Sequence, residues 1–326
     1  MATITPVDPS LNLKLKKQYA GGIFGEDPNF VQVGSKKWFF PERFQEYSST
    51  YKHFKVRSDD VWINGYPRSG TSVTADICWM LTHKMNFEVA KSTAFNDRSK
   101  LFELNTLFGK QSDLIKDAQH QEAFRNLFMS LENDPERRVI KTHLPYELLP
   151  DNLLTCGAKV IYIVRNIKDV ALSFYNLQST PTRENFGGNF EDFWSNLETD
   201  CLTFAPYWKH VEQGLQPAKN KLIVFYEEQI QDLRKGIKKL ADFLEVSLTE
   251  TQLDEMTDFF SFENYKKVTQ GKNFFNDNFE HVRKGQSGQW KKEFPDYLKK
   301  RADKWIQDNI KRSKNGDKLE KYLFSE

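Results

Sequence analysis

Short runs of β-branched and aromatic residues alternate along this chain with segments of helical periodicity. Three such runs, residues 60–64, 159–164 and 221–226, each precede a stretch with apolar residues spaced three or four apart. Residues 139–141 form a further short run of the same kind. Strands that alternate with helices form a parallel sheet covered by helices. The sequence therefore predicts an α/β fold with a central, mainly parallel sheet flanked by helices.

The chain of 326 residues is long enough for one large core or two. It has no internal repeat or low-complexity tract, and we predict a single domain over residues 1–326. Residues 1–55 are predicted to form an irregular N-terminal segment with scattered aromatic residues. The long connections 84–136 and 177–220 are expected to build a substrate pocket or lid. The basic stretch 295–322 is predicted to be a surface helix.

The charge and cysteine content exclude several classes of protein. Lys plus Arg (47) nearly balances Asp plus Glu (45), which argues against a nucleic-acid-binding surface. The three cysteines form no CxxC pair, which favours a reducing compartment and excludes a zinc motif. Asp8 and Pro9 occupy the place of a signal peptide's apolar core, and no apolar window reaches the ~18 residues of a membrane span. These features predict a cytoplasmic protein with no membrane segment.

The segment GYPRSGTS, residues 65–72, lies between a predicted strand and a predicted helix. A loop in this position presents backbone N–H groups to one point, and the helix N-terminus adds positive potential. Its first six positions match a P-loop of the form GxxxxGK[ST], but Thr71 replaces the lysine and the cation is Arg68 instead. This pattern predicts a P-loop-like anion cradle, with a plain strand–helix turn as the alternative.

Three further segments at strand ends or in loops carry candidate site residues. In KTHLP, Lys141 and His143 follow the second predicted strand, where His143 would serve as a general base or as a structural histidine. Arg165 and Ser173 follow the next strand and would bind a phosphate, unless Arg165 forms a salt bridge. The RKG of residues 283–285 suggests a loop over an anion, or a solvated loop. Two sets of phosphate-type donors and one base fit a ligand with an anionic group at each end of a nucleoside.

These segments resemble the cytosolic sulfotransferases, which use 3′-phosphoadenosine 5′-phosphosulfate (PAPS). The family's YPKSGTTW appears here as YPRSGTSV, KTHLP is intact, and RNxKDVxxSxY appears as RNIKDVALSFY over residues 165–175. FYEE at 225–228 is similar to the family's FYED, and RKGQSGQWKKEF at 283–294 to its RKGxxGDWKxxF. The Arg-containing loop looks most like insect members of the family.

The resemblance implies transfer of a sulfuryl group from PAPS to a hydroxyl, leaving 3′-phosphoadenosine 5′-phosphate (PAP), without a metal. By similarity, His143 would be the general base, Lys141 would stabilise the transferring group, and Arg68 would give electrostatic help to the leaving phosphate without general-acid catalysis. The implied binding residues are Arg68, Ser69, Gly70, Thr71 and Ser72 for the 5′-phosphosulfate; Arg165, Ser173, Arg283, Lys284 and Gly285 for the 3′-phosphate; Val73, Tyr226, Phe260, Ser261 and Phe262 for the adenine; and Lys141, Thr142, His143, Phe102 and Phe174 for the acceptor.

Some positions depart from the family pattern. Val73 stands where the family has a tryptophan, and Phe260 where it has threonine or serine. The family's dimer motif, KxxxTVxxxE, is altered over residues 291–300, so the oligomeric state stays open. The 27 phenylalanines favour a small hydrophobic acceptor: a phenol, a sterol or an isoprenoid alcohol. The alternatives are a P-loop nucleotide kinase, against which Thr71 and His143 argue, and a non-catalytic binder of nucleotides or lipophiles.

Overall fold

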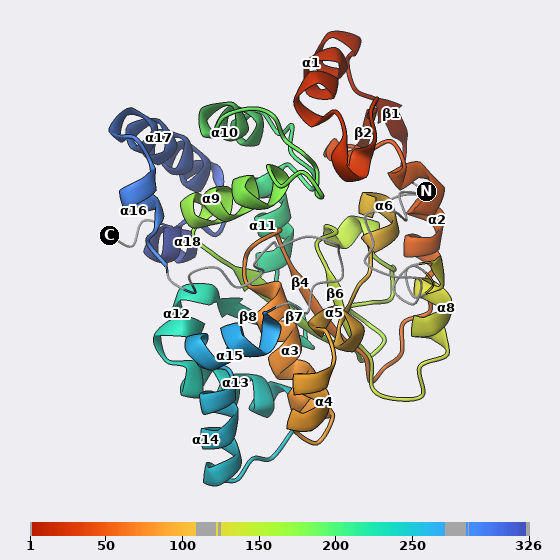
Figure 1. The fold of residues 1–326 in the computed structure, drawn as a ribbon, viewed down its shortest axis with the longest axis vertical. Helices are drawn as coiled ribbons and strands as arrows, with labels where there is room; N and C mark the ends of the chain where they lie inside the picture. The colour runs from red at the N-terminus through yellow and green to blue at the C-terminus, as the bar shows by residue number, and fades with distance from the viewer. Residues whose placement is uncertain (1, 109–121, 123–124, 271–284, 286, 324–326) are drawn as a thin grey trace.

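A five-stranded sheet forms the centre of the computed structural model, which describes residues 2–108, 122, 125–270, 285 and 287–323 (Figure 1). The strand order is β5-β6-β4-β7-β8, and every neighbouring pair is parallel. The strands are β4 (Val61–Gly65), β5 (Lys100–Leu101), β6 (Val139–Thr142), β7 (Lys159–Val164) and β8 (Lys221–Phe225). The predicted α/β fold with a parallel sheet is confirmed.

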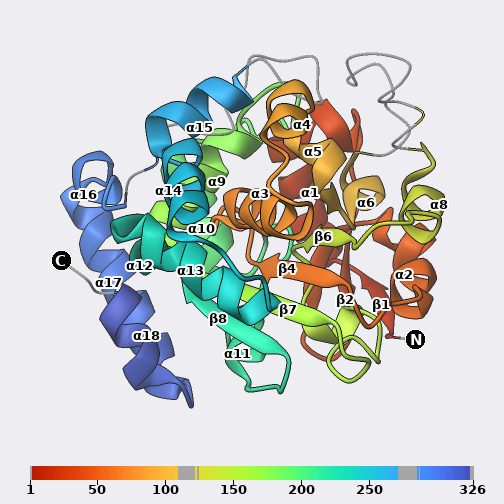
Figure 2. The same cartoon turned by 90° about the horizontal axis from the view of Figure 1, so that it is seen from below.

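Different helices cover the two faces of this sheet. Val61 and Ile63 of β4 pack in one hydrophobic cluster with α3 (Thr71–Thr82) and α13 (Leu233–Leu244). Trp62 points to the other face and packs in the cluster that contains α11 (Tyr207–Leu215). Figure 2 shows α3 and α11 on opposite sides of the sheet. Because side chains alternate between the faces of a strand, strands buried on both faces need the unbroken apolar runs seen in the sequence.

The helices that follow the strands begin close to their predicted positions. Residues 233–244 are helical as predicted. The helix expected from about residue 169 is α9 (Ile167–Gln178), which begins earlier because the Asn166 side chain accepts the Lys168 N–H at 3.0 Å as an N-cap. β8 ends one residue early, because Tyr226 already opens α12 (Tyr226–Gln231).

Residues 1–55 are not irregular, and that prediction is wrong. This segment contains β1 (Ile4–Pro6), α1 (Pro9–Tyr19), η1 (Gly22–Phe24), β2 (Phe30–Val33), β3 (Trp38–Pro41) and α2 (Phe44–His53). The three strands form an antiparallel sheet of their own. Strands of three or four residues are too short to show a period in the sequence, and this is why they were not predicted. The assignment of residues 1–326 to one domain stays a prediction.

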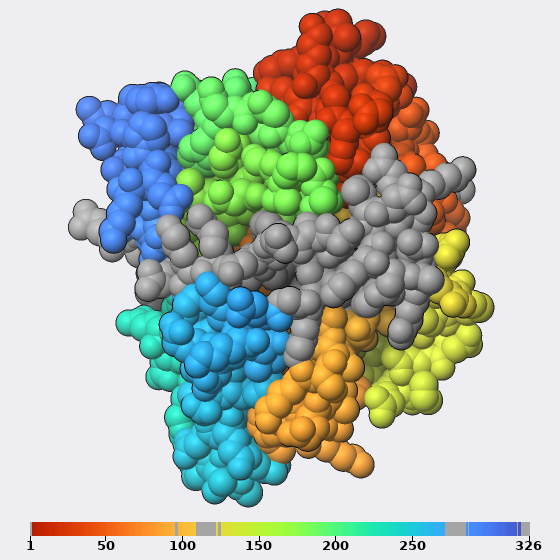
Figure 3. Space-filling view, viewed as in Figure 1, coloured from red at the N-terminus to blue at the C-terminus, as the bar shows by residue number. Residues whose placement is uncertain are grey.

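The remaining helices connect the strands or follow the sheet. They are α4 (Phe87–Ser92), α5 (Phe95–Arg98), α6 (Leu104–Phe108), α8 (Leu127–Glu132), η3 (Tyr146–Leu148), α10 (Phe190–Glu198), α14 (Glu250–Phe259), α15 (Phe262–Thr269), α16 (Trp290–Glu293), α17 (Asp296–Arg312) and α18 (Gly316–Leu323). In Figure 3 the green α9–α10 region lies between the red N-terminal segment and the blue C-terminal helices. Within the described ranges, no helix is both long and apolar enough to cross a bilayer.

Candidate active site

The loop between β4 and α3 depends on a glycine at its last position. Gly70 has φ of 101°, in the left-handed region, and it caps the N-terminus of α3. A Cβ atom at this position would lie 2.4 Å from Cδ2 of Tyr226. The loop backbone therefore lies directly against an aromatic ring at the end of β8. A helix N-terminus points the N–H groups of its first turn outward, toward any anion bound there, and α3 begins directly after this loop.

Two cations and a hydroxyl meet here, one each from this loop, from the end of β7 and from α9. Arg68 has its Nε donating to Ser173 Oγ at 2.9 Å, and Arg165 Nη1 donates to the Arg68 carbonyl oxygen at 2.9 Å. The Arg165 guanidinium also lies over the Tyr226 ring, 4.5 Å from its centroid. The structure thus brings together Arg68, Ser173, Arg165 and Tyr226, which the sequence assigns to one nucleotide site.

The segment after the predicted 3′-phosphate loop is attached to the start of α9. The Asp169 carboxylate accepts hydrogen bonds from Ser287 Oγ at 3.1 Å, Gly288 N at 2.6 Å and Trp290 N at 3.3 Å. Gly285 has φ of 60°, and a Cβ there would lie 2.0 Å from the Phe262 ring. Arg283 and Lys284 lie outside the described residues. The described end of this segment therefore meets both α9 and α15.

Three of the five predicted adenine residues share one apolar cluster. Tyr226 and Phe260 are buried in it, and Val73, in the first turn of α3, packs against it. Ser261 occupies the N-cap position of α15, one residue before Phe262. Of these residues, Tyr226 lies directly against the Gly70 end of the loop.

His143 lies at the carboxyl end of β6 with its ring orientation set by the backbone. Its Nδ1 is 2.7 Å from the carbonyl oxygen of Gly65, the last residue of β4. Because a carbonyl oxygen only accepts, Nδ1 carries the proton and Nε2 keeps a lone pair. Burial and the nearby charge of Lys141 lower the pKa of His143 to about 3, so the ring is neutral at physiological pH. A neutral, partly exposed imidazole with a lone pair on Nε2 can accept a proton.

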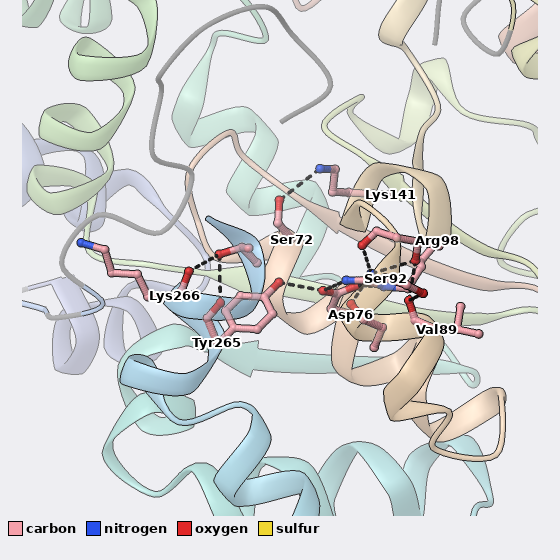
Figure 4. Close-up of polar contacts among 11 residues, drawn as sticks. Ser72, Asp76, Val89, Ser92, Arg98, Lys141, Tyr265 and Lys266 are labelled. Atoms are coloured by element: carbon pink, nitrogen blue, oxygen red, sulfur yellow. Dashed lines mark hydrogen bonds and ion pairs between the residues drawn. The ribbon is translucent and has the colours of Figure 1, made fainter. Parts of the chain in front are cut away.

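Lys141 and Ser72 link the end of β6 to the first turn of α3. Lys141 Nζ donates to Ser72 Oγ at 3.1 Å (Figure 4). Burial lowers the pKa of Lys141 to about 8; Glu103 acts in the opposite direction, and Arg68 lowers this pKa further. The cation at this point therefore depends on a carboxylate that the sequence analysis did not single out.

Two buried groups behind His143 were missed from the sequence. Glu103, fully buried, accepts Thr142 Oγ1 at 2.8 Å and the His143 N–H at 2.7 Å, and burial raises its pKa to about 7. His210 Nε2 donates to the His143 carbonyl at 2.9 Å, while its Nδ1 pairs with the Tyr162 hydroxyl at 2.8 Å. The two-residue strand β5 before Glu103 has no periodicity, and His210 lies in a helix far along the chain. Only the fold places them together.

The predicted acceptor residues occupy different environments. Phe102 is enclosed by the rings of Trp62, Tyr51, Phe54 and Phe128, which places it in the hydrophobic core. The Thr142 side chain is buried against Glu103 and supports the turn that carries His143.

Two further aromatic rings lie near Tyr66 and His143. Phe174 contacts Tyr66, with ring centroids 6.1 Å apart. Phe204, which the sequence did not single out, lies 5.6 Å from the His143 ring, edge to face. Both rings are buried and belong to the same hydrophobic cluster as Phe102.

Comparison with known proteins places these features in one family. The sulfotransferase domain model matches residues 58–314. The chain belongs to the sulfotransferase family. It is 27% identical to the luciferin sulfotransferase of Photinus pyralis over 300 residues, covering 86% of this chain and 80% of that protein. It is 29% identical to human sulfotransferase 1E1 over 279 residues, covering 83% and 90%.

A solved structure of retinol dehydratase in complex with retinol and PAP is similar to this sulfotransferase over 96% of the chain and 98% of its own length. The TM-score is 0.81 at 27% identity. A second complex, of retinol dehydratase with androsterone and PAP, matches with the same TM-score at 26% identity. This protein is a PAPS-dependent sulfotransferase of the cytosolic type, as the resemblance implied.

The described residues fit such a donor. A glycine loop packed against Tyr226, two guanidinium groups and the hydroxyl of Ser173 supply donors for anionic groups beside an apolar cluster. Among the described residues, no three His, Cys, Asp or Glu side chains gather closely enough to hold a metal ion.

Proposed function

We propose that this sulfotransferase transfers the sulfuryl group of PAPS to the hydroxyl of a small hydrophobic acceptor, with His143 as the general base. The observation that carries the proposal is the 2.7 Å contact between His143 Nδ1 and the Gly65 carbonyl oxygen. It holds the proton on Nδ1 and leaves Nε2 as the acceptor of a proton. The same carbonyl belongs to the strand that leads into the phosphate loop, so base and donor site share one rigid element.

In the proposed step, the acceptor oxygen bonds to sulfur while the bond from sulfur to the phosphate oxygen breaks. The acceptor's proton moves to His143 Nε2, and the departing electron pair stays on the phosphate of PAP. Lys141 offsets charge on the transferring group, and Arg68 offsets charge on the leaving phosphate. Arg68 keeps its own proton, because a guanidinium stays charged.

The low pKa of His143 is compatible with this role. Burial lowers this pKa most, and the charges of Lys141 and Arg68 lower it further. Negative charge from the donor beside Lys141 and Arg68 would weaken their effect on His143. We therefore expect His143 to be a stronger base in the complex than in the free protein.

The proposed donor site follows the sequence assignments. The 5′-phosphosulfate would be held by Arg68, Ser69, Gly70, Thr71 and Ser72; the 3′-phosphate by Arg165, Ser173, Arg283, Lys284 and Gly285; and the adenine by Val73, Tyr226, Phe260, Ser261 and Phe262. We further propose that residues 1–326 act as one domain in the cytosol.

The acceptor is proposed to be a phenol, a sterol or another lipophilic alcohol. The similar retinol dehydratase structures contain retinol and androsterone, each a hydrophobic alcohol. In this chain, the aromatic rings of Phe204 and Phe174 lie near His143 and Tyr66. Rings in these positions would bind a flat or elongated apolar molecule and leave its hydroxyl at the base.

The test is transfer from radiolabelled PAPS to a panel of phenols, sterols and retinol-like alcohols. Labelled product with at least one of these acceptors is expected. PAP binding with no transfer to any of them would contradict the proposed acceptor class.

The activity is expected to fall at alkaline pH. Lys141, with a pKa of about 8, loses its positive charge above that pH, so kcat/KM measured at low PAPS should decline there. His143, with a pKa of about 3, is already neutral, so it should cause no loss at any pH above about 5. The alkaline limb of the pH profile should move to higher pH in the Lys141→Arg variant. A profile that falls instead between pH 7 and 5, and does so only while His143 is present, would contradict this assignment.

Glu103 is expected to act on His143 and Lys141 without touching substrate. Glu103→Ala leaves the buried His143 N–H without an acceptor, which should lower kcat by about tenfold. Glu103→Gln keeps an acceptor for that N–H but removes the charge that supports Lys141. Its alkaline limb should therefore move to lower pH, with a smaller loss of kcat. Identical pH profiles for the wild type and Glu103→Gln would refute the electrostatic part of this role.

A further inference from the structure

A buried carboxylate on α3 joins that helix to the 87–98 segment and to α15 through side chains that have no part in the proposed reaction. Asp76 accepts Nε of Arg98 at 3.0 Å, Nη2 of Arg98 at 2.6 Å, and the hydroxyl of Tyr265 at 2.9 Å (Figure 4). All three side chains are buried, with Asp76 only 1% exposed. A buried charge is retained at such a point only when it is fully paired. We call Asp76, Arg98 and Tyr265 the α3 junction.

The α3 junction lies between elements that carry different parts of the proposed site. Asp76 is one helical turn after Ser72, whose hydroxyl meets Lys141. Arg98 closes the 87–98 segment by donating also to the carbonyl oxygens of Ala90 at 2.9 Å and Thr93 at 2.6 Å. Tyr265 supplies the contact from α15, through its hydrogen bond to Asp76. Because Arg98 already has Asp76 and these two carbonyls, its segment stays tied to α3 without Tyr265.

On α15, Tyr265 lies close to two of the proposed adenine residues. Its ring packs against Phe260, with centroids 5.4 Å apart, and it is one helical turn from Phe262. Phe262 in turn lies directly against Gly285, where a Cβ would be 2.0 Å away. The hydrogen bond of the Tyr265 hydroxyl therefore joins α15 to α3. On the α15 side, it lies next to the group formed by Phe260, Phe262 and Gly285.

We propose that Tyr265 is a positioning residue for the donor nucleotide. Its hydrogen bond to Asp76 holds α15 at a fixed distance from α3, so that the adenine side and the phosphate side of the donor site are aligned before PAPS binds. This inference rests on the proposed donor site. Without the hydroxyl, α15 occupies competent and incompetent positions, and the apparent dissociation constant rises as the competent fraction falls.

The test variant is Tyr265→Phe, which keeps the ring and its packing and leaves Asp76 paired with Arg98. Titration with PAP is expected to show a dissociation constant about five- to tenfold higher than that of the wild type, the size expected for losing one typical intramolecular hydrogen bond. The KM for PAPS should rise in parallel, while kcat at saturating PAPS stays within about twofold. Amide exchange of residues 262–270 should be faster in the free variant and return to the wild-type rate with saturating PAP.

The matched control is Tyr297→Phe, because Tyr297 also donates its hydroxyl to a carboxylate, that of Glu191 at 2.7 Å, but is 55% exposed and lies on α17. It should leave PAP affinity unchanged. An unchanged PAP affinity in Tyr265→Phe overturns the proposal, even if the melting temperature falls. So does a loss of kcat at saturating PAPS with normal PAP affinity, which would place the role on the acceptor side.

Arg165→Ala separates this inference from the proposed donor site. If Arg165→Ala weakens PAP binding and Tyr265→Phe does not, the donor site stands and the role of Tyr265 is wrong. If Arg165→Ala binds PAP like the wild type, the donor site is misplaced and the inference is lost with it.

Discussion

Replacing His143 with alanine is expected to lower kcat by roughly 100- to 10,000-fold, the usual contribution of a positioned general base. The Gly65 carbonyl fixes the imidazole ring through Nδ1, so that the lone pair on Nε2 has one orientation. Alanine has no group that accepts a proton, and a water molecule in place of the ring would not be held in that orientation. PAP binding should change little, because the ring is not among the groups that would hold the nucleotide. Steady-state transfer rates and a PAP titration on the same preparation measure both effects.

The matched control is His53→Ala. His53 is exposed and hydrogen-bonds only within α2, to Ser49. It should retain wild-type kcat and wild-type PAP affinity. A His143→Ala enzyme that keeps more than about a tenth of the wild-type kcat would rule out His143 as the base. A variant that loses PAP binding as well would show that His143 acts through the loop instead.

Substituting alanine for Gly70 is expected to weaken PAP binding by roughly 10- to 100-fold, because a non-glycine residue is strained at a φ of 101°. The added Cβ would lie 2.4 Å from Tyr226, so the ring must move. Its movement would also disturb Arg165, which lies 4.5 Å over that ring. Calorimetric titration with PAP, together with thermal unfolding, separates lost affinity from lost stability.

Gly187→Ala is the control for this change. Gly187 has no positive φ, and the nearest atom to an added Cβ is the Gln18 carbonyl oxygen at 3.9 Å. PAP affinity should remain within about twofold of the wild type. Equal affinities for Gly70→Ala and the wild type would mean that the loop does not hold the donor.

The sequence was sufficient for four of the five strands of the central sheet and for the motif residues at its carboxyl edge. Apolar runs such as 159–164 identify strands buried on both faces, and parallel strands end at one edge of a sheet. Arg68, His143 and Arg165 each directly follow such a strand or lie in the loop after it. Their proximity therefore follows from topology: in the structure, His143 contacts Gly65 at the end of β4, and Arg165 contacts Arg68 in the loop after it.

The contacts that tune this site were not predictable in the same way. Glu103 follows a two-residue strand, His210 lies on α11, and Tyr265 lies on α15. Each is an ordinary residue in its own segment, and none belongs to a motif. Their partners are 40, 67 and 189 positions away in the chain. The N-terminal sheet was missed for a related reason, since its strands are defined by pairing with each other and not by a local period.

Local pattern thus determined which strands and loops carry the proposed site residues of this sulfotransferase, because periodicity and turn composition act over a few neighbouring residues. The tertiary structure alone decided the protonation and alignment of those groups. A pKa of about 3 for His143 or about 8 for Lys141 arises from burial and from charges on other elements, which come together only when the chain has folded.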